Sequence, residues 1–212
     1  MPQRIVICTG GSLEDWALQY IEKEDLLIGA DSGARFLAVH GYRIDAAIGD
    51  FDSVSLEDMD LIRKSSVRTI ECDPIDKDYT DTELAVRLAL DMKPKELLIL
   101  GALGTRFDHT LANVYLLALA AEQAVSASII DRHNKITVIR NNLTLRKEGY
   151  DHVSLLPLSA VVSGITLTGF QYPLTNAELT IGQTLGISNV LEAEAGSIEI
   201  TSGLLLVIQS RD

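Results

Sequence analysis

Short apolar runs alternate with longer, helix-like segments through the first two thirds of the chain. Such runs have the length of buried strands, and they fall at residues 4–8, 26–31, 46–49, 67–73, 96–102 and 127–131. Strands that alternate with helices are typical of a doubly wound, mostly parallel sheet. The pattern therefore predicts an α/β fold for this part of the chain.

Helix start and stop signals lie between these runs. Ser12 and Asp15 resemble a capping box that opens a short helix reaching Ile21. Gly41 stands in the usual glycine stop position after a helix over residues 34–40. Three predicted strands are thus separated by two predicted helices.

Two further helices are predicted later in the same region. Thr80 and Glu83 form a capping box for a helix over residues 82–92. A long apolar helix follows residue 110, and one of its faces carries Leu111, Tyr115, Ala118 and Leu119. The charged stretch between residues 54 and 67 is assigned no secondary structure.

The pattern changes at about residue 136. Short β-rich runs separated by Gly, Ser, Asn and Pro follow, at residues 136–141, 153–158, 164–170, 178–182, 197–201 and 204–209. The alternation over 197–201 is the period of two that marks a half-buried strand. We therefore predict an α/β domain over residues 1–135 and a smaller all-β sandwich or barrel-like domain over residues 136–212.

Composition narrows the classes of function. Thirty acidic residues against 18 basic ones give a formal net charge of −12, which argues against a nucleic-acid-binding face. Cys8 and Cys72 form no CxxC pair, so a zinc site or a disulfide scaffold is not expected. No apolar leader segment or membrane-length apolar stretch is present, and we expect a cytoplasmic protein that does not bind membranes.

Unusual polar residues follow the predicted strands. In an open α/β sheet, ligands bind outside the carboxyl ends of the strands. The residues at those ends are Gly10 and Gly11, Asp31, Asp50 and Asp52, the 76–81 loop, and Arg106 to Asp108. We therefore expect an active site at this edge of the sheet.

Asp50 and Asp52 are the central pair, because two carboxylates on a strand-end loop suit Mg²⁺. A solvated acidic turn is the alternative. Asp31, Asp81 and Asp108 are each also placed where they could cap or begin a helix. A capping role and a role in the site are compatible.

Three cations accompany this acidic edge: Arg35, Lys77 and Arg106. Each could be an ordinary surface charge. Arg106 is the strongest candidate, because it follows a glycine and immediately precedes a predicted helix start. A guanidinium beside a helix N-terminus suits a phosphate group.

Six segments, in order, resemble the bacterial form of the thiamine pyrophosphokinase family. They are ADSGARFL (30–37), IGDFDSV (48–54), DKDYTDTELA (76–85), GALGTRFDHTLAN (101–113), GFQYPL (169–174) and GISN (186–189). The resemblance implies transfer of the pyrophosphoryl group of ATP to the hydroxyl of thiamine, which gives thiamine diphosphate and AMP. It also implies a homodimer in which the β domain helps to build the thiamine site.

The resemblance also implies roles for individual residues. The metal-binding carboxylates, expected to hold Mg²⁺, are Asp50, Asp52 and Asp81. ATP is expected to bind Asp31 and Arg106, which match the family, together with Gly10, Gly11, Arg35 and Lys77, which are expected there from their positions near the strand ends. The expected thiamine-binding residues are Asp108, Tyr172, Ser188 and Asn189. Arg106 and Asp108, with the metal-binding carboxylates, are expected near the reacting groups.

This chain departs from the family at two points. The position of Lys77 is glutamine in some relatives. Some relatives have a tryptophan shortly after the position of Asn189, whereas the segment here, VLEAEA, has no aromatic residue. Stacking on the thiamine ring is then expected from Tyr172 or Tyr79.

Three other functions are compatible with parts of the pattern. DFDSV resembles the DxDx[TV] nucleophile box of haloacid-dehalogenase phosphatases, although that box normally follows the first strand and here follows the third. A related pyrophosphokinase could act on another alcohol, such as a pterin. A non-catalytic sensor of nucleotide or thiamine is the third alternative.

Overall fold

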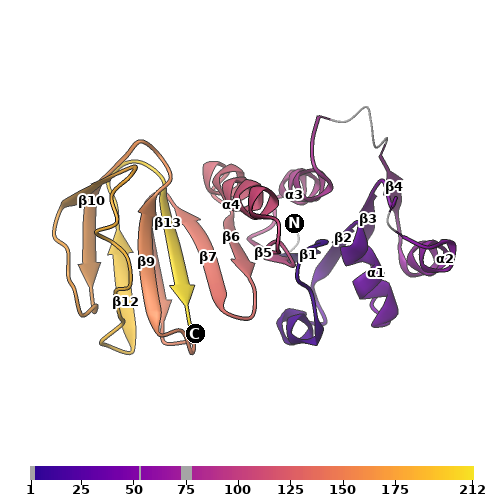
Figure 1. Ribbon diagram of the computed structural model, residues 1–212, viewed down its shortest axis with the longest axis horizontal. Coiled ribbons are helices and arrows are strands. Elements are labelled where there is room, and N and C mark those ends of the chain that lie inside the picture. Colours follow the sequence, from indigo (N-terminus) through magenta and orange to yellow (C-terminus); the bar gives the residue numbers. More distant parts are fainter. Residues whose placement is uncertain (1–2, 53, 73–77) are drawn as a thin grey trace. The chain divides into compact units, whose positions relative to one another are not determined.

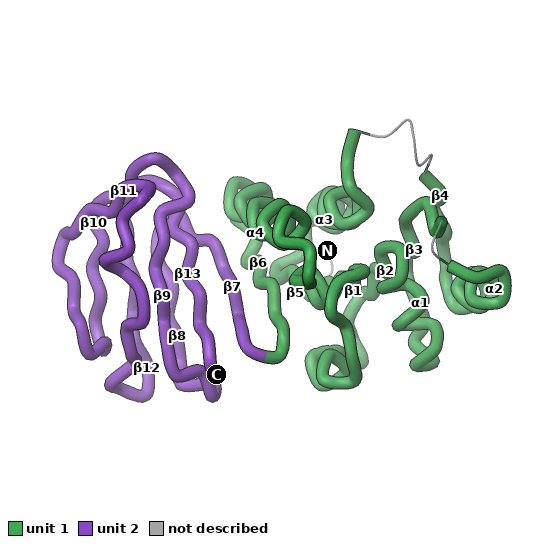
Figure 2. The backbone as a smooth tube through the Cα atoms, in the orientation of Figure 1, with its two compact units in different colours: residues 1–132 green, residues 133–212 purple. Residues whose placement is uncertain are grey.

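The computed structural model describes residues 3–52, 54–72 and 78–212 (Figure 1). These residues form two compact units, residues 1–132 and residues 133–212 (Figure 2). Each unit has its own hydrophobic core. Among the residues described, no helix is both long and apolar enough to cross a membrane.

Unit 1 contains a parallel sheet of six strands, as the sequence pattern predicted. The structure gives their order, β4-β3-β2-β1-β5-β6. The strands are β1 (Arg4–Cys8), β2 (Leu26–Ala30), β3 (Ala46–Gly49), β4 (Thr69–Glu71), β5 (Glu96–Leu100) and β6 (Ser126–Ile130). The four strands β1, β2, β3 and β5 are almost entirely buried, which explains their continuous apolar runs.

The helical elements of unit 1 are η1 (Asp15–Tyr20), α1 (Ser32–Val39), α2 (Leu56–Ser65), α3 (Asp81–Asp91) and α4 (Phe107–Glu122). Helices α1 and α2 contact one another and share a core cluster with β1, whereas α3 and α4 lie on the other face of the sheet (Figure 1). The predicted N-cap of α3 is confirmed, because the Thr80 hydroxyl accepts the backbone N–H of Glu83 at 3.2 Å. The Glu83 carboxylate pairs with Arg87. Gly41 follows α1 with a φ of +75°, as its stop position requires.

The predicted capping box at Ser12 is wrong. Element η1 is a short 3-10 helix, and Glu14 occupies its N-cap position. The backbone N–H of Ser12 instead donates to Leu103 O at 2.8 Å. A contact to a segment far along the chain therefore decides the conformation at Ser12.

Helix α2 was missed by the sequence analysis. It is capped by Ser55, whose hydroxyl accepts the N–H of Asp58 at 3.1 Å. Ile62 is its single fully buried residue, and most of its residues are charged or polar, so the segment does not stand out as a packed helix. Its acidic first turn and basic last turn agree with the helix dipole.

The apolar face of α4 named above is not the buried one. Leu111 and Tyr115 are 38% and 53% exposed, whereas Val114, Leu117 and Ala120 are buried. This helix is apolar almost all round, so periodicity alone could not identify the face that packs on the sheet.

Unit 2 is all β, as expected. Its strands are β7 (Asn134–Ile139), β8 (Asn142–Arg146), β9 (His152–Pro157), β10 (Val161–Thr168), β11 (Ala177–Thr180), β12 (Ala195–Glu199) and β13 (Leu205–Ser210). Antiparallel pairing joins β7-β13-β9 into one group and β11-β10-β12-β8 into another. Side chains from both groups form one core that includes Leu155, Ile165 and Ile198.

The two faces of α4 can be distinguished by truncation. We expect Leu117→Ala to lower the free energy of unfolding of unit 1 by about 2–5 kcal/mol, because it leaves a cavity in a packed core. Leu111→Ala removes the same atoms from an exposed position and should cost much less. Urea denaturation of both variants provides the comparison. Equal losses would contradict the assignment of the buried face.

Candidate active site

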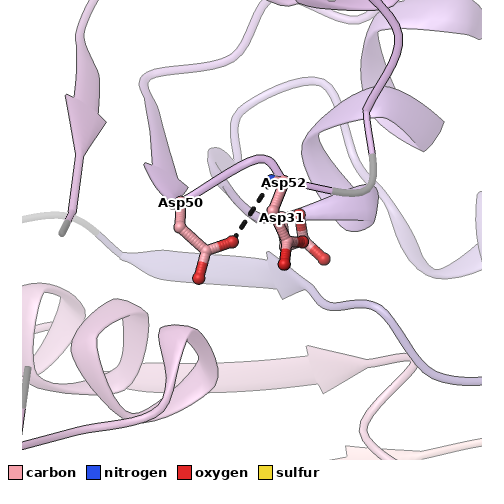
Figure 3. Close-up of side chains that lie close together, drawn as sticks. All are labelled: Asp31, Asp50 and Asp52. Carbon is pink, nitrogen blue, oxygen red and sulfur yellow. Dashed lines mark hydrogen bonds between the residues drawn. The ribbon is translucent and has the colours of Figure 1, made fainter. Parts of the chain in front are cut away.

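Three carboxylates lie together at the carboxyl edge of the unit 1 sheet. Asp31 follows β2, and Asp50 and Asp52 follow β3. Each offers an oxygen within 4.8 Å of the others, and the backbone N–H of Asp52 donates to Asp50 Oδ1 at 3.3 Å (Figure 3). Asp31 and Asp50 are half-buried, and Asp52 is exposed. The sequence analysis predicted the Asp50–Asp52 pair but did not place Asp31 in the metal group.

The backbone is unusual at this cluster. Asp31 and Phe51 have φ values of 50° and 54°, in the left-handed region that side chains rarely adopt. The Phe51 side chain is buried in the core, so it anchors the loop that carries Asp50 and Asp52. Strained backbone of this kind persists where surrounding packing enforces it, and it gathers at functional sites.

Gly49 lets the end of β3 approach Asp31 closely. The backbone N–H of Asp31 donates to Ile48 O at 2.9 Å. A Cβ at Gly49 would lie 3.2 Å from Asp31 N, and the φ of +155° is also unfavourable for a side chain. The glycine before the first aspartate thus brings the two strand ends, and their carboxylates, together.

The carboxylates of this cluster repel one another. Burial raises the pKa of Asp31, and the negative charges of Asp81, Asp50 and Asp52 raise it further, although a hydrogen bond with the backbone of Ser32 acts in the opposite direction. A bound cation would relieve this repulsion. The three carboxylates offer hard oxygen donors, which are the ligands that Mg²⁺ prefers.

A cavity of about 330 Å³ lies beside the cluster. Its walls come from the loop after β1 (Thr9–Gly11), Asp31, the start of α3 (Thr80–Thr82), the loop after β5, and the start of α4. It therefore brings together five of the predicted residues: Gly10, Gly11, Asp31, Asp81 and Arg106. The N-terminal ends of two helices meet at this cavity, and such ends attract anions.

Gly11 holds two of these loops against each other. Its N–H donates to Gly101 O at 2.7 Å. A Cβ at Gly11 would lie 2.3 Å from Gly101 O and 2.5 Å from Leu103 O, which is too close for any side chain. The glycine is thus required for the packing that forms this wall of the cavity.

The cavity also has polar residues that were not predicted from the sequence, among them Thr9, Thr82, His109 and Asn113. The hydroxyls of Thr9 and Thr82 are hydrogen-bonded at 3.0 Å and so link β1 to α3. Asn113 is buried and donates to Ala102 O at 2.7 Å. A signal was present for α4, since His109 and Asn113 are spaced four apart in a helix that is otherwise mostly apolar.

Arg106 and Asp108 form an ion pair, with Arg106 Nη2 2.7 Å from Asp108 Oδ2. Both side chains are exposed. The hydrogen bond from Arg106, followed by one from the backbone of His109, lowers the pKa of Asp108. Asp108 therefore remains anionic. Arg106 also lines the cavity and brings a positive charge to it.

Other predicted residues lie elsewhere or remain undescribed. Arg35 does not line the 330 Å³ cavity; it pairs with Asp58 at 2.7 Å and borders a neighbouring cavity of about 240 Å³ that also touches Gly11. Lys77 lies outside the described residues. The ring of Tyr79 is covered by Arg87, whose guanidinium carbon lies 4.5 Å from the ring centroid.

The predicted thiamine-binding residues of unit 2 differ in accessibility. Tyr172 is 59% exposed, and Ser188 is exposed with a left-handed φ of 57°. Asn189 is 7% exposed, and its amide bonds to the backbone of Tyr172 and Val190. Tyr172 and Ser188 are therefore the accessible members of this group.

Comparisons with known proteins agree on one family. Residues 17–129 match the model of the thiamin pyrophosphokinase catalytic domain, and residues 140–205 match that of the thiamin pyrophosphokinase vitamin B1 binding domain. Thiamine pyrophosphokinase from Bacillus subtilis is 34% identical over 195 residues, which cover 91% of each chain.

Solved structures give the same result. The crystal structure of thiamine pyrophosphokinase from Bacillus subtilis has a TM-score of 0.91 at 33% identity, covering 99% of both chains. That of thiamin pyrophosphokinase from Geobacillus thermodenitrificans has a TM-score of 0.88 at 34% identity, covering 99% of this chain and 98% of its own. The similarity thus extends over both units.

The raised pKa of Asp31 predicts a pH-dependent effect of its removal. Without metal, the folded state keeps a proton on Asp31 at pH values where the unfolded chain has already released it. The free energy of unfolding therefore falls as the pH rises through that range. We expect Asp31→Asn, which keeps a carbonyl oxygen and loses the charge, to raise the melting temperature at neutral pH. The gain should shrink as the pH is lowered toward about 3.

Thermal unfolding in EDTA measures this difference, with Asp60→Asn on the exposed side of α2 as the control. A difference between wild type and Asp31→Asn that stayed constant with pH would rule out the charge as its cause.

Proposed function

The chain belongs to the thiamine pyrophosphokinase family, and on that basis we propose that it transfers the pyrophosphoryl group of ATP to the hydroxyl of thiamine, forming thiamine diphosphate and AMP. The observation that carries this proposal is the carboxylate cluster beside a cavity at which two helices begin. Acidic side chains for a cation and helix N-termini for phosphates are what a polyphosphate substrate requires.

Asp50, Asp52 and Asp81 are proposed to hold Mg²⁺. Asp31 joins the proposed group because its carboxylate lies with those of Asp50 and Asp52, whereas Asp81 lies at the cavity beside them. A bound divalent cation neutralises charge on phosphate oxygens during such transfers. The carboxylates alone would repel a polyphosphate, so the reaction is expected to need the metal. Phe51 and Gly49 contribute by holding these carboxylates at one point.

The ATP phosphates are proposed to bind along Gly10, Gly11 and Arg106. Helices α3 and α4 begin at the same cavity and favour negative charge there. Arg106 pairs with Asp108 and would exchange this partner, wholly or in part, for a phosphate oxygen. Arg35, at the neighbouring cavity, and Lys77 are proposed to contact other parts of the nucleotide.

Thiamine is proposed to contact Tyr172 and Ser188 in unit 2 and Asp108 in unit 1. Thiamine carries a positive charge on its thiazolium ring, and Asp108 is an anion whose pKa is lowered by Arg106. An exposed aromatic ring such as that of Tyr172 suits the face of a flat cation. The serine hydroxyl supplies a hydrogen-bonding group at an exposed position.

A homodimer is also proposed, in the cytoplasm where ATP is available. Its support is the stripe of Phe107, Leu111 and Tyr115, which are exposed and spaced four apart along α4. Light scattering, which gives the mass of the particle in solution, distinguishes a dimer from a monomer.

The phosphatase alternative is not favoured. The DFDSV segment follows β3 rather than the first strand. The family assignment and the second, all-β unit agree with a pyrophosphokinase instead.

The product of ATP tests the proposal directly. With thiamine, ATP and Mg²⁺, we expect AMP and thiamine diphosphate to form in equal amounts, because attack occurs at the β phosphorus. Chromatography of nucleotides and thiamine esters measures both. Formation of ADP with thiamine monophosphate would mean a simple kinase, and phosphate release without thiamine would favour a phosphatase. Greater turnover with a pterin alcohol would change the acceptor.

Replacement of the central carboxylates tests the metal assignment. Asp50→Asn and Asp52→Asn should each lower kcat by about a hundredfold or more, because the charge that holds the cation is lost. Both should unfold at or above the wild-type temperature, because each removes a charge that repels Asp31, whereas Asp60→Asn should have wild-type activity. Near wild-type turnover in both variants at limiting Mg²⁺ would rule out this metal site.

A further inference from the structure

The side chain of Asn189 makes three hydrogen bonds inside unit 2. Its Nδ2 donates to Tyr172 O at 2.7 Å, and its Oδ1 accepts the N–H of Tyr172 at 3.1 Å and that of Val190 at 2.8 Å. Only 7% of the residue is exposed. Two of the three bonds hold both backbone groups of a single residue, Tyr172.

These bonds extend a short antiparallel pairing. Phe170 and Leu191 form a β-bridge, and the N–H of Gln171 donates to Val190 O at 2.9 Å. The backbone ladder stops at Pro173, because proline has no N–H to donate. The amide of Asn189 has the same donor and acceptor as a peptide group, so it continues the pairing by one step.

The backbone of Asn189 is held on its other side. Its N–H donates to Val153 O at 2.9 Å, and its carbonyl accepts the N–H of Val153 at 2.7 Å. Val153 belongs to β9, in the core of unit 2. A rigid strand therefore positions Asn189, and Asn189 in turn positions Tyr172.

Tyr172 is held firmly by its backbone while its side chain remains 59% exposed. Pro173 adds to this constraint, because a residue before proline is restricted to extended conformations. An exposed aromatic ring on a fixed backbone loses little conformational entropy when a ligand stacks on it. This is the arrangement expected of a platform for a flat ring.

We propose that Asn189 is a positioning residue: its side-chain amide fixes the backbone of Tyr172, whose ring is the proposed stacking surface for the aromatic cation of the substrate. The inference rests on the proposed function, in which that cation is thiamine. It changes the role of Asn189 from a direct contact to an indirect one. The bonding of its amide supports this, since the oxygen already accepts two hydrogen bonds.

Tyr172 would supply the aromatic ring that the segment after Asn189 does not contain. Residues 190–195 contain no aromatic side chain, so a stacking partner has to come from another segment. The bonds from Asn189 place the GFQYPL segment directly beside the GISN segment, although they are 17 residues apart at Tyr172 and Asn189. Tyr172 is the exposed aromatic ring of that first segment.

The test compares five variants of the full chain: Tyr172→Ala, Tyr172→Phe, Asn189→Ala, the double variant Tyr172→Ala/Asn189→Ala, and Gln171→Ala. The last is the matched control, because Gln171 is exposed and joins the pairing only through its backbone. For each, the Kd for thiamine is measured by calorimetry, and the KM values for thiamine and for ATP are measured in turnover. Melting temperatures show which variants are folded.

Tyr172→Ala should raise the Kd and KM for thiamine by about tenfold, as expected for the loss of stacking with a cation. Tyr172→Phe should stay within about twofold of wild type, because the ring remains. Asn189→Ala should resemble Tyr172→Ala, and the double variant should be no worse than Tyr172→Ala alone. The KM for ATP should be unchanged throughout, and Gln171→Ala should behave as wild type.

Unchanged thiamine affinity in Asn189→Ala, or effects of the two residues that multiply in the double variant, would overturn the positioning role. Equal losses for thiamine and ATP would indicate general damage and would also overturn it. If Asn189→Ala does not fold, Asn189→Leu serves in its place, because leucine is close to asparagine in shape and removes all three side-chain hydrogen bonds without adding a charge.

The inference and the proposed function fail in different ways. A wild-type protein that binds thiamine without making thiamine diphosphate would remove the proposed activity, while the Kd values would still test Tyr172 and Asn189. A wild-type protein that binds no thiamine would overturn the platform itself.

Discussion

Parallel pairing of β2 with β3 is the constraint on which the chemistry of unit 1 depends. Ala30 pairs with Ile48, so the two strands end side by side and both continue directly into aspartates. Because parallel strands end at the same edge of a sheet, residues 19 positions apart in the chain, Asp31 and Asp50, come within reach of one cation. An antiparallel partner in place of β3 would have put these carboxylates at opposite edges.

Bringing three carboxylates together is energetically unfavourable, and the packing around them stabilises the arrangement. Burial and the neighbouring charges raise the pKa of Asp31, and the backbone adopts left-handed conformations at Asp31 and Phe51. Burial of Phe51, the close approach at Gly49 and the packing of Gly11 against Gly101 keep these groups in place. The core of unit 1 thus stabilises an arrangement that a divalent cation would relax.

Unit 2 shows the same principle with neutral groups. Asn189 is buried, and its amide forms hydrogen bonds that a backbone ladder would otherwise have formed. Buried polar groups are expensive unless they are satisfied, so an amide used in this way specifies one conformation for the segment that it holds. In both units, therefore, buried and well-packed residues determine where exposed polar or aromatic side chains stand.

Much of this protein was determined by local sequence. The apolar runs identified all six parallel strands, and Thr80 with Glu83 indicated the start of α3. The change of pattern near residue 136 indicated the all-β part of the chain. Asp50 and Asp52 could be paired from sequence because they are two residues apart. Local spacing and hydrogen-bonding capacity suffice for such features, and they do not depend on what the rest of the chain does.

Tertiary structure alone decided the remainder. Which face of α4 is buried, the contact that draws Ser12 away from a helix cap, and the approach of Asp31 to Asp50 each depend on segments far apart in the chain. The burial of the Asn189 amide depends on β9 and on the segment at Tyr172. A residue type reveals which bonds a side chain can form, but only the folded chain decides which partners come within 3 Å of it and which side chains remain for a ligand.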